Sequence, residues 1–349
     1  MQMLTLEKFE EASEKVKEVT LETKLVYSDF LSEQTGNKVY LKPENMQFTG
    51  AYKVRGAYYK ISTLTETERK KGLITASAGN HAQGVAYAAK CYGCKAVIVM
   101  PTTTPLIKVN RTKSYGAEVV LCGDVYDEAC QKAYELAEEK GLFIMEAFWI
   151  RFLPAYDKLR AMLRDGVIGE VKRITSQFGF TVEGDRRERK FKSELGGGAL
   201  LDIGIYNLGF FHMITEAAPE GFQSEVHMTE YGTDDYSEVE LEYPGGCSAH
   251  CIQAIGKKLE RHAKIEGTKG DILMDDFQHL QEFTVQLKDG SSYLVKEPFK
   301  VNGFEYEIVE TSRCVSCGLN TSDRYTKEDC LTILRLMDDI RDSWDMTFE

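Results

Sequence analysis

Four short apolar runs recur in the first half of the chain at nearly constant spacing. They begin at Leu73, Ala96, Glu118 and Leu142, so successive starts are 23, 22 and 24 residues apart. Each gap holds a segment long enough for a helix. Short buried strands that alternate with helices predict right-handed β-α-β crossovers and a parallel sheet.

The pattern changes after Gly166 to strands in which apolar and polar residues alternate, separated by turn residues. The predicted strands are Val171–Phe180, Ser224–Tyr231, Ser237–Tyr243, Glu282–Leu287 and Ser291–Val295. Two amphipathic segments follow, and they predict helices near Phe304–Gly318 and over Lys327–Asp342. Such a series predicts an open, mainly antiparallel sheet with helices on one face. The fold class expected is therefore α/β for a domain at 1–144, followed by α+β for a domain at 145–349.

Composition excludes some classes of protein but says little about the chemistry of this one. The chain has 349 residues, of which 43% are hydrophobic, and a net charge of −12. A net negative charge argues against a nucleic-acid surface, which would need basic patches to neutralise phosphates. No apolar run approaches the roughly 20 residues of a membrane helix, and we recognise no secretory leader. We expect a cytoplasmic protein that contacts neither nucleic acid nor membrane.

The cysteines favour reduced thiols. Their number, nine, is odd, and two Cys-x-x-Cys pairs begin at Cys91 and Cys314. The pairs lie more than two hundred residues apart, whereas zinc fingers place theirs much closer. We expect no metal site.

Two segments in the first half carry specific chemistry: Lys42–Ala57, which contains Tyr52-Lys53, and Thr75–Gly84, which reads Thr-Ala-Ser-Ala-Gly-Asn-His-Ala-Gln-Gly. From about residue 4 to residue 144 the chain resembles the threonine ammonia-lyase and serine racemase group of fold-type-II pyridoxal-phosphate enzymes. The resemblance implies the small-domain fold of that group, a pyridoxal phosphate cofactor and a small amino acid, threonine or serine, as substrate.

The resemblance assigns roles to these residues. Lys53 would bond the cofactor aldehyde and move the substrate's Cα proton, which suits a desolvated amine. Tyr52 would pack beside the cofactor ring, and Asn80 would hydrogen-bond its phenolic oxygen. The substrate carboxylate would be held by the loop at a helix start, where free amides suit an anion. That loop is made of Ser77, Ala78, Gly79, Asn80 and His81.

Plainer interpretations stand beside these roles. A single lysine is usually a solvated surface residue, Asn80 beside a glycine is often a turn residue, and His81 receives no proton-transfer role. The family's phosphate-binding loop and the partner of its ring nitrogen are not recognisable after residue 145. We therefore expect an incomplete cofactor site and impaired deamination.

A second resemblance begins near residue 136 and rests on Met145–Pro154 and on Gly196–Tyr206, which reads Gly-Gly-Gly-Ala-Leu-Leu-Asp-Ile-Gly-Ile-Tyr. It is to the glucose–fructose oxidoreductase and inositol dehydrogenase (Gfo/Idh/MocA) family, in particular its dihydrodiol dehydrogenase branch. Asp202 and Tyr206 are one helical turn apart and share a face. The resemblance implies that Tyr206 exchanges the proton that accompanies hydride transfer and that Asp202 orients it.

The same resemblance implies that Trp149 and Arg151 line the substrate pocket. As alternatives, Asp202 caps a helix, and Tyr206 and Trp149 are packed core aromatics. Neither a Gly-x-Gly-x-x-Gly fingerprint nor the family's Glu-Lys-Pro motif is present, so we expect no NAD(P) binding.

Three hypotheses follow for the chain as a whole. The first is an impaired, threonine ammonia-lyase-like enzyme that acts through Lys53. The second is an NAD(P)-dependent oxidoreductase that acts through Asp202 and Tyr206. The third is a non-catalytic hybrid of the two families, whose resemblances overlap at Ala137–Ile144. By resemblance to the second family we also expect a homodimer through the C-terminal sheet.

Overall fold

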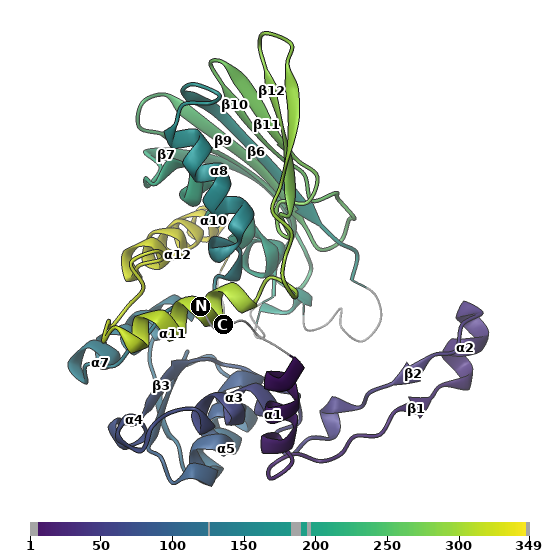
Figure 1. The fold of residues 1–349 in the computed structure, drawn as a ribbon, viewed down its shortest axis with the longest axis vertical. Coiled ribbons are helices and arrows are strands. Elements are labelled where there is room, and N and C mark those ends of the chain that lie inside the picture. The colour runs from purple at the N-terminus through teal and green to yellow at the C-terminus, as the bar shows by residue number, and fades with distance from the viewer. Residues whose placement is uncertain (1–5, 125, 183–189, 194–196, 347–349) are drawn as a thin grey trace. The chain divides into compact units, whose positions relative to one another are not determined.

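The computed structural model describes residues 6–124, 126–182, 190–193 and 197–346 (Figure 1). Gly196, the first glycine of the run quoted above, lies outside these residues. The chain divides into two compact units, Met1–Ile144 and Met145–Glu349. Each unit is described by itself.

The first unit consists of short helices around a small sheet. Its elements are α1 (Leu6–Val16), β1 (Val26–Tyr27), α2 (Asp29–Thr35), β2 (Tyr40–Leu41), η1 (Glu44–Met46), α3 (Lys53–Ser62), α4 (Glu66–Lys71), β3 (Leu73–Ala76), α5 (Asn80–Tyr92), β4 (Ala96–Met100), α6 (Leu106–Ser114), β5 (Glu118–Leu121) and α7 (Tyr126–Glu139).

The three strands β3, β4 and β5 form a parallel sheet in that order, which confirms the predicted parallel arrangement. The prediction of a strand at Leu142 is wrong. The amide of Leu142 donates instead to the Ala137 carbonyl at 2.8 Å and closes the end of α7. Gly141, with φ of 59°, makes that turn possible. Beyond it, Ile144 packs against buried side chains of β4 and α7 without joining the sheet.

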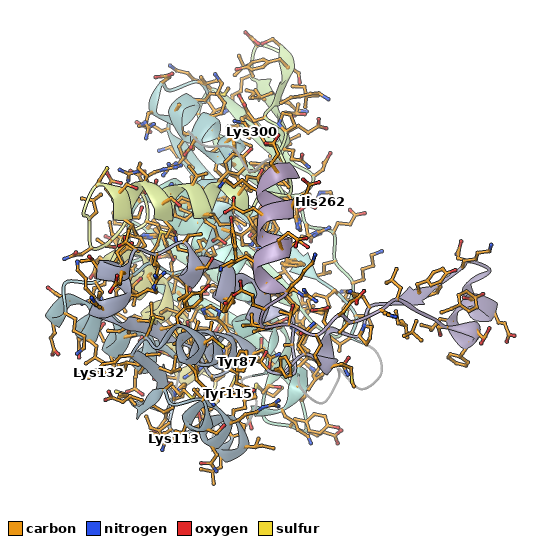
Figure 2. The ribbon with its side chains drawn as sticks, turned by 60° about the horizontal axis from the view of Figure 1, so that its bottom comes forward. Tyr87, Lys113, Tyr115, Lys132, His262 and Lys300 are labelled. Atoms are coloured by element: carbon orange, nitrogen blue, oxygen red, sulfur yellow. The ribbon has the colours of Figure 1, made fainter. Side chains whose placement is uncertain are left out.

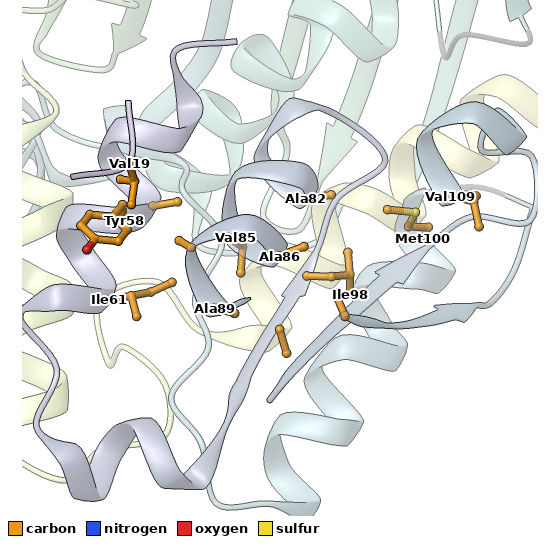
Figure 3. Close-up of a cluster of buried hydrophobic side chains, with 14 of the residues drawn as sticks. Val19, Tyr58, Ile61, Ala82, Val85, Ala86, Ala89, Ile98, Met100 and Val109 are labelled. Atoms are coloured by element: carbon orange, nitrogen blue, oxygen red, sulfur yellow. The ribbon is translucent and has the colours of Figure 1, made fainter. Parts of the chain in front are cut away.

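The core of the first unit lies between α3, α5 and the central strand β4 (Figure 3). Tyr58 and Ile61 from α3 meet Ala82 and Ala86 from α5, and Ile98 of β4 is fully buried beside them. The small residues of α5 allow a close approach: a Cβ on Gly84 would lie 3.2 Å from the backbone of Lys53. The start of α3 is therefore fixed against α5. At the edge of this core, Tyr87 and Tyr115 pack against the buried residues and meet edge to face, with ring centroids 5.3 Å apart (Figure 2).

An arm formed by β1, α2 and β2 extends from this unit (Figure 1). Its two strands pair through only two residues each, and it exposes large apolar side chains, with Phe30 66% exposed. Glu44 holds the base of the arm, because its carboxylate accepts two hydrogen bonds from Arg55, at 2.8 and 2.9 Å, and one from Thr23 at 2.5 Å. The Arg55 guanidinium lowers the pKa of Glu44 to about 2.

The second unit contains a large sheet and its covering helices. Its elements are η2 (Trp149–Phe152), α8 (Pro154–Arg164), β6 (Val171–Gly179), the π-helical η4 (Leu200–Gly204), α10 (Ile205–Thr215), β7 (Gly221–Met228), β8 (Asp234–Tyr243), β9 (Cys247–Ala254), β10 (Ala263–Gly267), β11 (Gly270–Met274), β12 (Glu282–Leu287), β13 (Ser292–Lys296), α11 (Glu305–Ser316) and α12 (Lys327–Asp342).

Eight strands form one mixed sheet in the order β13-β12-β11-β10-β6-β9-β8-β7. The β6–β9 pair is parallel and the other neighbours are antiparallel. The predicted strand Ser224–Tyr231 is instead Gly221–Met228, because the Thr229 amide donates to the Thr233 carbonyl and closes a turn there.

The two faces of this sheet differ. One face packs against α10, which α12 and α8 contact in turn (Figure 1). It is buried, with Ile174, Val239 and Ile265 fully inaccessible. The opposite face, which we call the open face, carries partly exposed ion pairs such as Arg173–Glu240 at 2.7 Å. Within the described ranges of the chain, no helix is both long and apolar enough to span a bilayer.

Candidate functional site

In the first unit the predicted lysine begins a helix. Lys53 is the first residue of α3, where a turn with Gly50 at φ of 75° precedes it. Its side chain is exposed, and its Nζ atom lies 5.4 Å from the centre of the Tyr52 ring. Tyr52 is itself 58% exposed. The amine and the aromatic ring are thus adjacent on an accessible surface.

The predicted loop lies at the carboxyl end of β3. The Ser77 amide extends the ladder by donating to the Val99 carbonyl at 3.0 Å, and the Ser77 hydroxyl then accepts the Gly79 amide at 3.2 Å. Ala78 and Gly79 are half-buried, and Asn80 begins α5. The carboxyl end of a parallel strand, followed by a helix start, is where sheets of this kind bind ligands.

The lysine and the loop lie close together. Partial desolvation lowers the pKa of the His81 imidazole, and the nearby Lys53 ammonium lowers it further. The contact of Gly84 with the Lys53 backbone holds the two helix starts side by side. The structure therefore brings the starts of α3 and α5 side by side, with Lys53 next to the Tyr52 ring and near the His81 imidazole.

In the second unit Asp202 and Tyr206 lie on consecutive turns, Asp202 within η4 and Tyr206 in the first turn of α10. The Asp202 carboxylate pairs with the Lys190 ammonium, which also lies 5.7 Å from the Phe180 ring centre. The Tyr206 ring contacts Phe148 and Phe178, with centroids 6.0 and 6.1 Å away.

The glycines before Asp202 allow close contacts that a side chain at either position would block. A Cβ on Gly197 would lie 2.6 Å from the Lys190 carbonyl oxygen, and a Cβ on Gly198 would lie 2.5 Å from Asp234. Gly198 also has φ of 116°, a region that favours glycine. The turn thereby brings Lys190 beside Asp202.

The other two predicted residues lie in η2, in different surroundings. Trp149 is 5% exposed and packs on Phe304 and His279, with ring centroids 4.8 and 5.2 Å away. Burial lowers the pKa of Arg151 to about 10, and the neighbouring Arg160 guanidinium adds to that effect. The structure brings Asp202 and Tyr206 together, whereas Trp149 makes core contacts and Arg151 lies among the charged groups of α8.

Two side chains of this site were not anticipated. Lys190 lies twelve residues before Asp202, and Asp234 lies on β8. Neither belongs to a local motif, and only the acidic pair Asp234-Asp235 at the start of a strand offers a faint signal.

Two further clusters are less specific. A cavity of about 350 Å³ lies on the open face of the sheet. It is lined by Thr175, Ser176, Gln177, His250, Ile252, His262, Ala263, Lys264, Leu273, Met274 and Asp275. Elsewhere Glu310, Cys314 and Asp323 bring potential metal ligands together, but Arg313 pairs with both carboxylates. That cluster is an ion-pair network.

Comparisons with known proteins give each unit a relative. Residues 16–157 match the pyridoxal-phosphate dependent enzyme family. The chain is 50% identical to an L-threonine ammonia-lyase of Thermotoga maritima over 146 residues, and 47% identical to a catabolic L-threonine dehydratase of Staphylococcus aureus over 154 residues. These matches cover 42% and 44% of this chain, and 36% and 44% of the two relatives. The chain thus spans less than half the length of either curated relative.

Residues 156–273 match the GFO/IDH/MocA C-terminal domain. In fold the chain is similar to an aldose-aldose oxidoreductase of Caulobacter crescentus, with a TM-score of 0.58 and 20% identity over 84% of this chain and 87% of that one. It is also similar to a 3-ketoreductase of Actinomadura kijaniata, with a TM-score of 0.55 and 20% identity over 71% and 76% of the two chains. The chain therefore joins a segment of the pyridoxal-phosphate dependent enzyme family to a GFO/IDH/MocA C-terminal domain.

Proposed function

We propose that the first unit binds pyridoxal phosphate through Lys53 and deaminates threonine or serine slowly. One observation carries the proposal: Lys53 lies near His81, the last residue of the predicted loop, at the start of the helix that packs against α5. The identity to L-threonine ammonia-lyase supports the same assignment.

The residues present fit the reactive part of the cofactor. Lys53 is accessible to an aldehyde, and Tyr52 offers an aromatic face next to it. Asn80, exposed at the start of α5, has an amide suited to a phenolic oxygen, and the free amides there suit a substrate carboxylate. Pyridoxal phosphate, when bound, supplies an electron sink for the substrate's Cα carbanion. Lys53 would take the Cα proton, and the loop would orient the carboxylate.

We propose slow turnover because the residues assigned so far address the aldehyde and the carboxylate, and none addresses the phosphate. The phosphate is the most strongly charged part of the cofactor and is normally held by several amide donors or cations. Without such a cradle the cofactor would bind weakly and sample unproductive orientations. Misplacing reacting groups by about 1 Å can cost roughly a hundredfold in rate.

The test is titration of the full-length protein with pyridoxal phosphate. We expect an absorbance band at about 410–420 nm, typical of the lysine-bound cofactor, and its loss in Lys53→Ala. The control is Lys60→Ala, at an exposed lysine of the same helix, which should keep the band. A band that survives in Lys53→Ala, or the absence of any band in the unmodified protein, would contradict the proposal. Rapid, saturable formation of 2-oxobutanoate from threonine would contradict slow turnover alone.

A second candidate function belongs to the second unit. The Lys190–Asp202 pair beside Tyr206 favours a site that exchanges protons with a hydroxyl or carbonyl substrate, as in a nicotinamide-dependent oxidoreductase. Calorimetry with NADPH and NADH tests it: micromolar binding would support it, and no detectable heat would exclude hydride transfer by this chain.

We also propose that two copies of the chain form a dimer through the open face, independently of which activity the protein has. It is an accessible sheet face with a cavity lined in part by Ile252 and Leu273 and edged by charges of both signs. Light scattering should give the mass of a dimer. Leu273→Lys should give the mass of a monomer, whereas Lys288→Glu, at a turn in the same unit, should remain dimeric.

A further inference from the structure

A chain of buried polar side chains connects the sheet of the second unit to α10. Ser176 donates to Asn207 at 2.8 Å, Asn207 to Gln253 at 3.0 Å, Gln253 to Ser237 at 2.9 Å, and Ser237 to Asp234 at 2.9 Å. None of the five side chains is more than 5% exposed. The chain ends on a carboxylate.

That carboxylate sits at the start of the helical segment that carries Asp202 and Tyr206. Its Oδ2 atom accepts the amide of Leu200, the first residue of η4, at 2.9 Å. Its Oδ1 atom occupies the space that a side chain at residue 198 would fill. Asp234 therefore caps the helix from a distant strand, in the place that a neighbouring residue usually takes.

Packing alone does not account for a carboxylate here. A buried charge without a cation is costly, and a neutral side chain would fill the same space. A negative charge is favoured where the free amides of a helix start converge, because those amides carry partial positive charge. Burial raises the pKa of Asp234 to about 6, whereas the hydrogen bonds of the Leu200 and Ala199 amides lower it, so these amides favour the ionised form and partly offset the cost of burying it.

The turn that Asp234 holds is an unusual one. Residues 200–204 are π-helical, a widened geometry common at functional sites, and it contains Asp202. On the accessible side Lys190 pairs with the Asp202 carboxylate. The segment is thus fixed from the buried side by Asp234 and from the accessible side by Lys190.

We propose that Asp234 is a positioning residue: its buried carboxylate holds the start of η4 so that Asp202 and Tyr206 face the same site. What the site formed by Asp202 and Tyr206 does rests on the second candidate function. The geometry that we propose for it does not. Asp234 acts through Leu200 and contacts no substrate.

Hydrogen exchange of the full-length protein, followed by mass spectrometry, tests the inference. In Asp234→Ala the amides of residues 200–206 should exchange at least about fivefold faster, the effect expected from losing a helix cap. The amides of β8 and β9 should be unchanged. Asp234→Asn, whose side-chain oxygen can still accept the Leu200 amide, should recover most of the protection. The control is Asp235→Asn, the adjacent carboxylate, which pairs with His227.

A second readout follows Tyr206 directly. In protein with ¹³C-labelled tyrosine, the Tyr206 ring signal, assigned with Tyr206→Phe, should shift in Asp234→Ala and stay in place in Asp235→Asn. Should Asp234→Ala fail to fold, Ser237→Ala removes one donor to the carboxylate and should give a smaller change in the same direction.

Unchanged protection and an unmoved Tyr206 signal would overturn the inference. So would equal acceleration across the whole sheet, which would make Asp234 a general stability residue. Failure to bind NADPH would remove the second candidate function and leave these measurements unaffected.

Discussion

Asp234 gives the second unit a pH dependence of unusual sign. Burial raises the pKa of its carboxyl from the ordinary 3.8 to about 6. The folded protein therefore binds this proton more tightly than the unfolded chain does. The stability that the proton confers is fully present below about pH 3.8 and is lost as the pH rises through about 6. Most surface carboxylates in ion pairs behave in the opposite way.

The magnitude follows from the shift. One pKa unit corresponds to 1.36 kcal/mol, so a displacement from 3.8 to about 6 is worth about 3 kcal/mol in the free energy of unfolding. About 2 kcal/mol of this falls between about pH 4.5 and about pH 7.5. Because whole domains are stable by only about 5–15 kcal/mol, the effect is large enough to measure.

Tryptophan fluorescence provides a selective assay. The chain has two tryptophans, Trp149 and Trp344, and both lie in the second unit. Urea unfolding of the unmodified protein and of Asp234→Asn is followed through this signal across the pH range. The other titrating groups cancel in the difference between the two proteins, which should change by about 2 kcal/mol in favour of the variant as the pH rises. A difference that stays constant with pH would show that Asp234 does not titrate there, and the reasoning from its burial would fail.

Three further substitutions test the packing of buried positions and the ion pair at the base of the arm. Ile98→Ala removes a fully buried side chain from the central strand of the first unit and should cost about 2–5 kcal/mol in urea unfolding followed by far-ultraviolet circular dichroism. Gly198→Ala should destabilise the second unit by more than Gly245→Ala, by at least about 2 kcal/mol in tryptophan-detected unfolding. Both glycines have positive φ, but only a Cβ at residue 198 meets another atom, Asp234 Oδ1; equal costs would contradict this. Glu44→Gln should lower the stability of the first unit at neutral pH by about 1–2 kcal/mol and by progressively less as the pH falls from about 4.5 towards 2, because the depressed pKa confers stability only above that window. Circular dichroism at neutral and acidic pH measures the difference, and a pH-independent loss would contradict it.

The elements that sequence periodicity could predict are those whose hydrogen bonds are local or whose two faces differ. The helix Lys327–Asp342 appears with the predicted bounds, since Thr326 and Asp329 form a capping box at its start. The run at Leu142 is apolar enough for a strand, but strand formation also needs a neighbour in register. Its first amide is already used to end α7. Periodicity contains no information about that competition.

The two candidate sites differ in the same way. Lys53 and the loop at Asn80 belong to two short motifs, and their chemistry could be proposed from sequence because neighbouring residues specify each backbone turn. Asp234 and Lys190 act on η4 across separations of 34 and 12 residues. Only the folded chain brings them together. A single sequence therefore suggests candidate reacting groups, but it does not predict the contacts that Asp234 and Lys190 make with η4.

The two sites also stand in different relations to a ligand. Lys53 is exposed, whereas a nucleophilic lysine works best when desolvated. A bound cofactor would itself have to exclude water from the Lys53 amine. In the second unit, burying the ionised Asp234 carboxylate beneath η4 costs about 3 kcal/mol, and the fold bears this cost without a ligand. A site that incurs this cost before binding is preorganised. The geometry of Asp202 and Tyr206 should therefore persist without a ligand, while Lys53 should lose contact with water only when the cofactor binds.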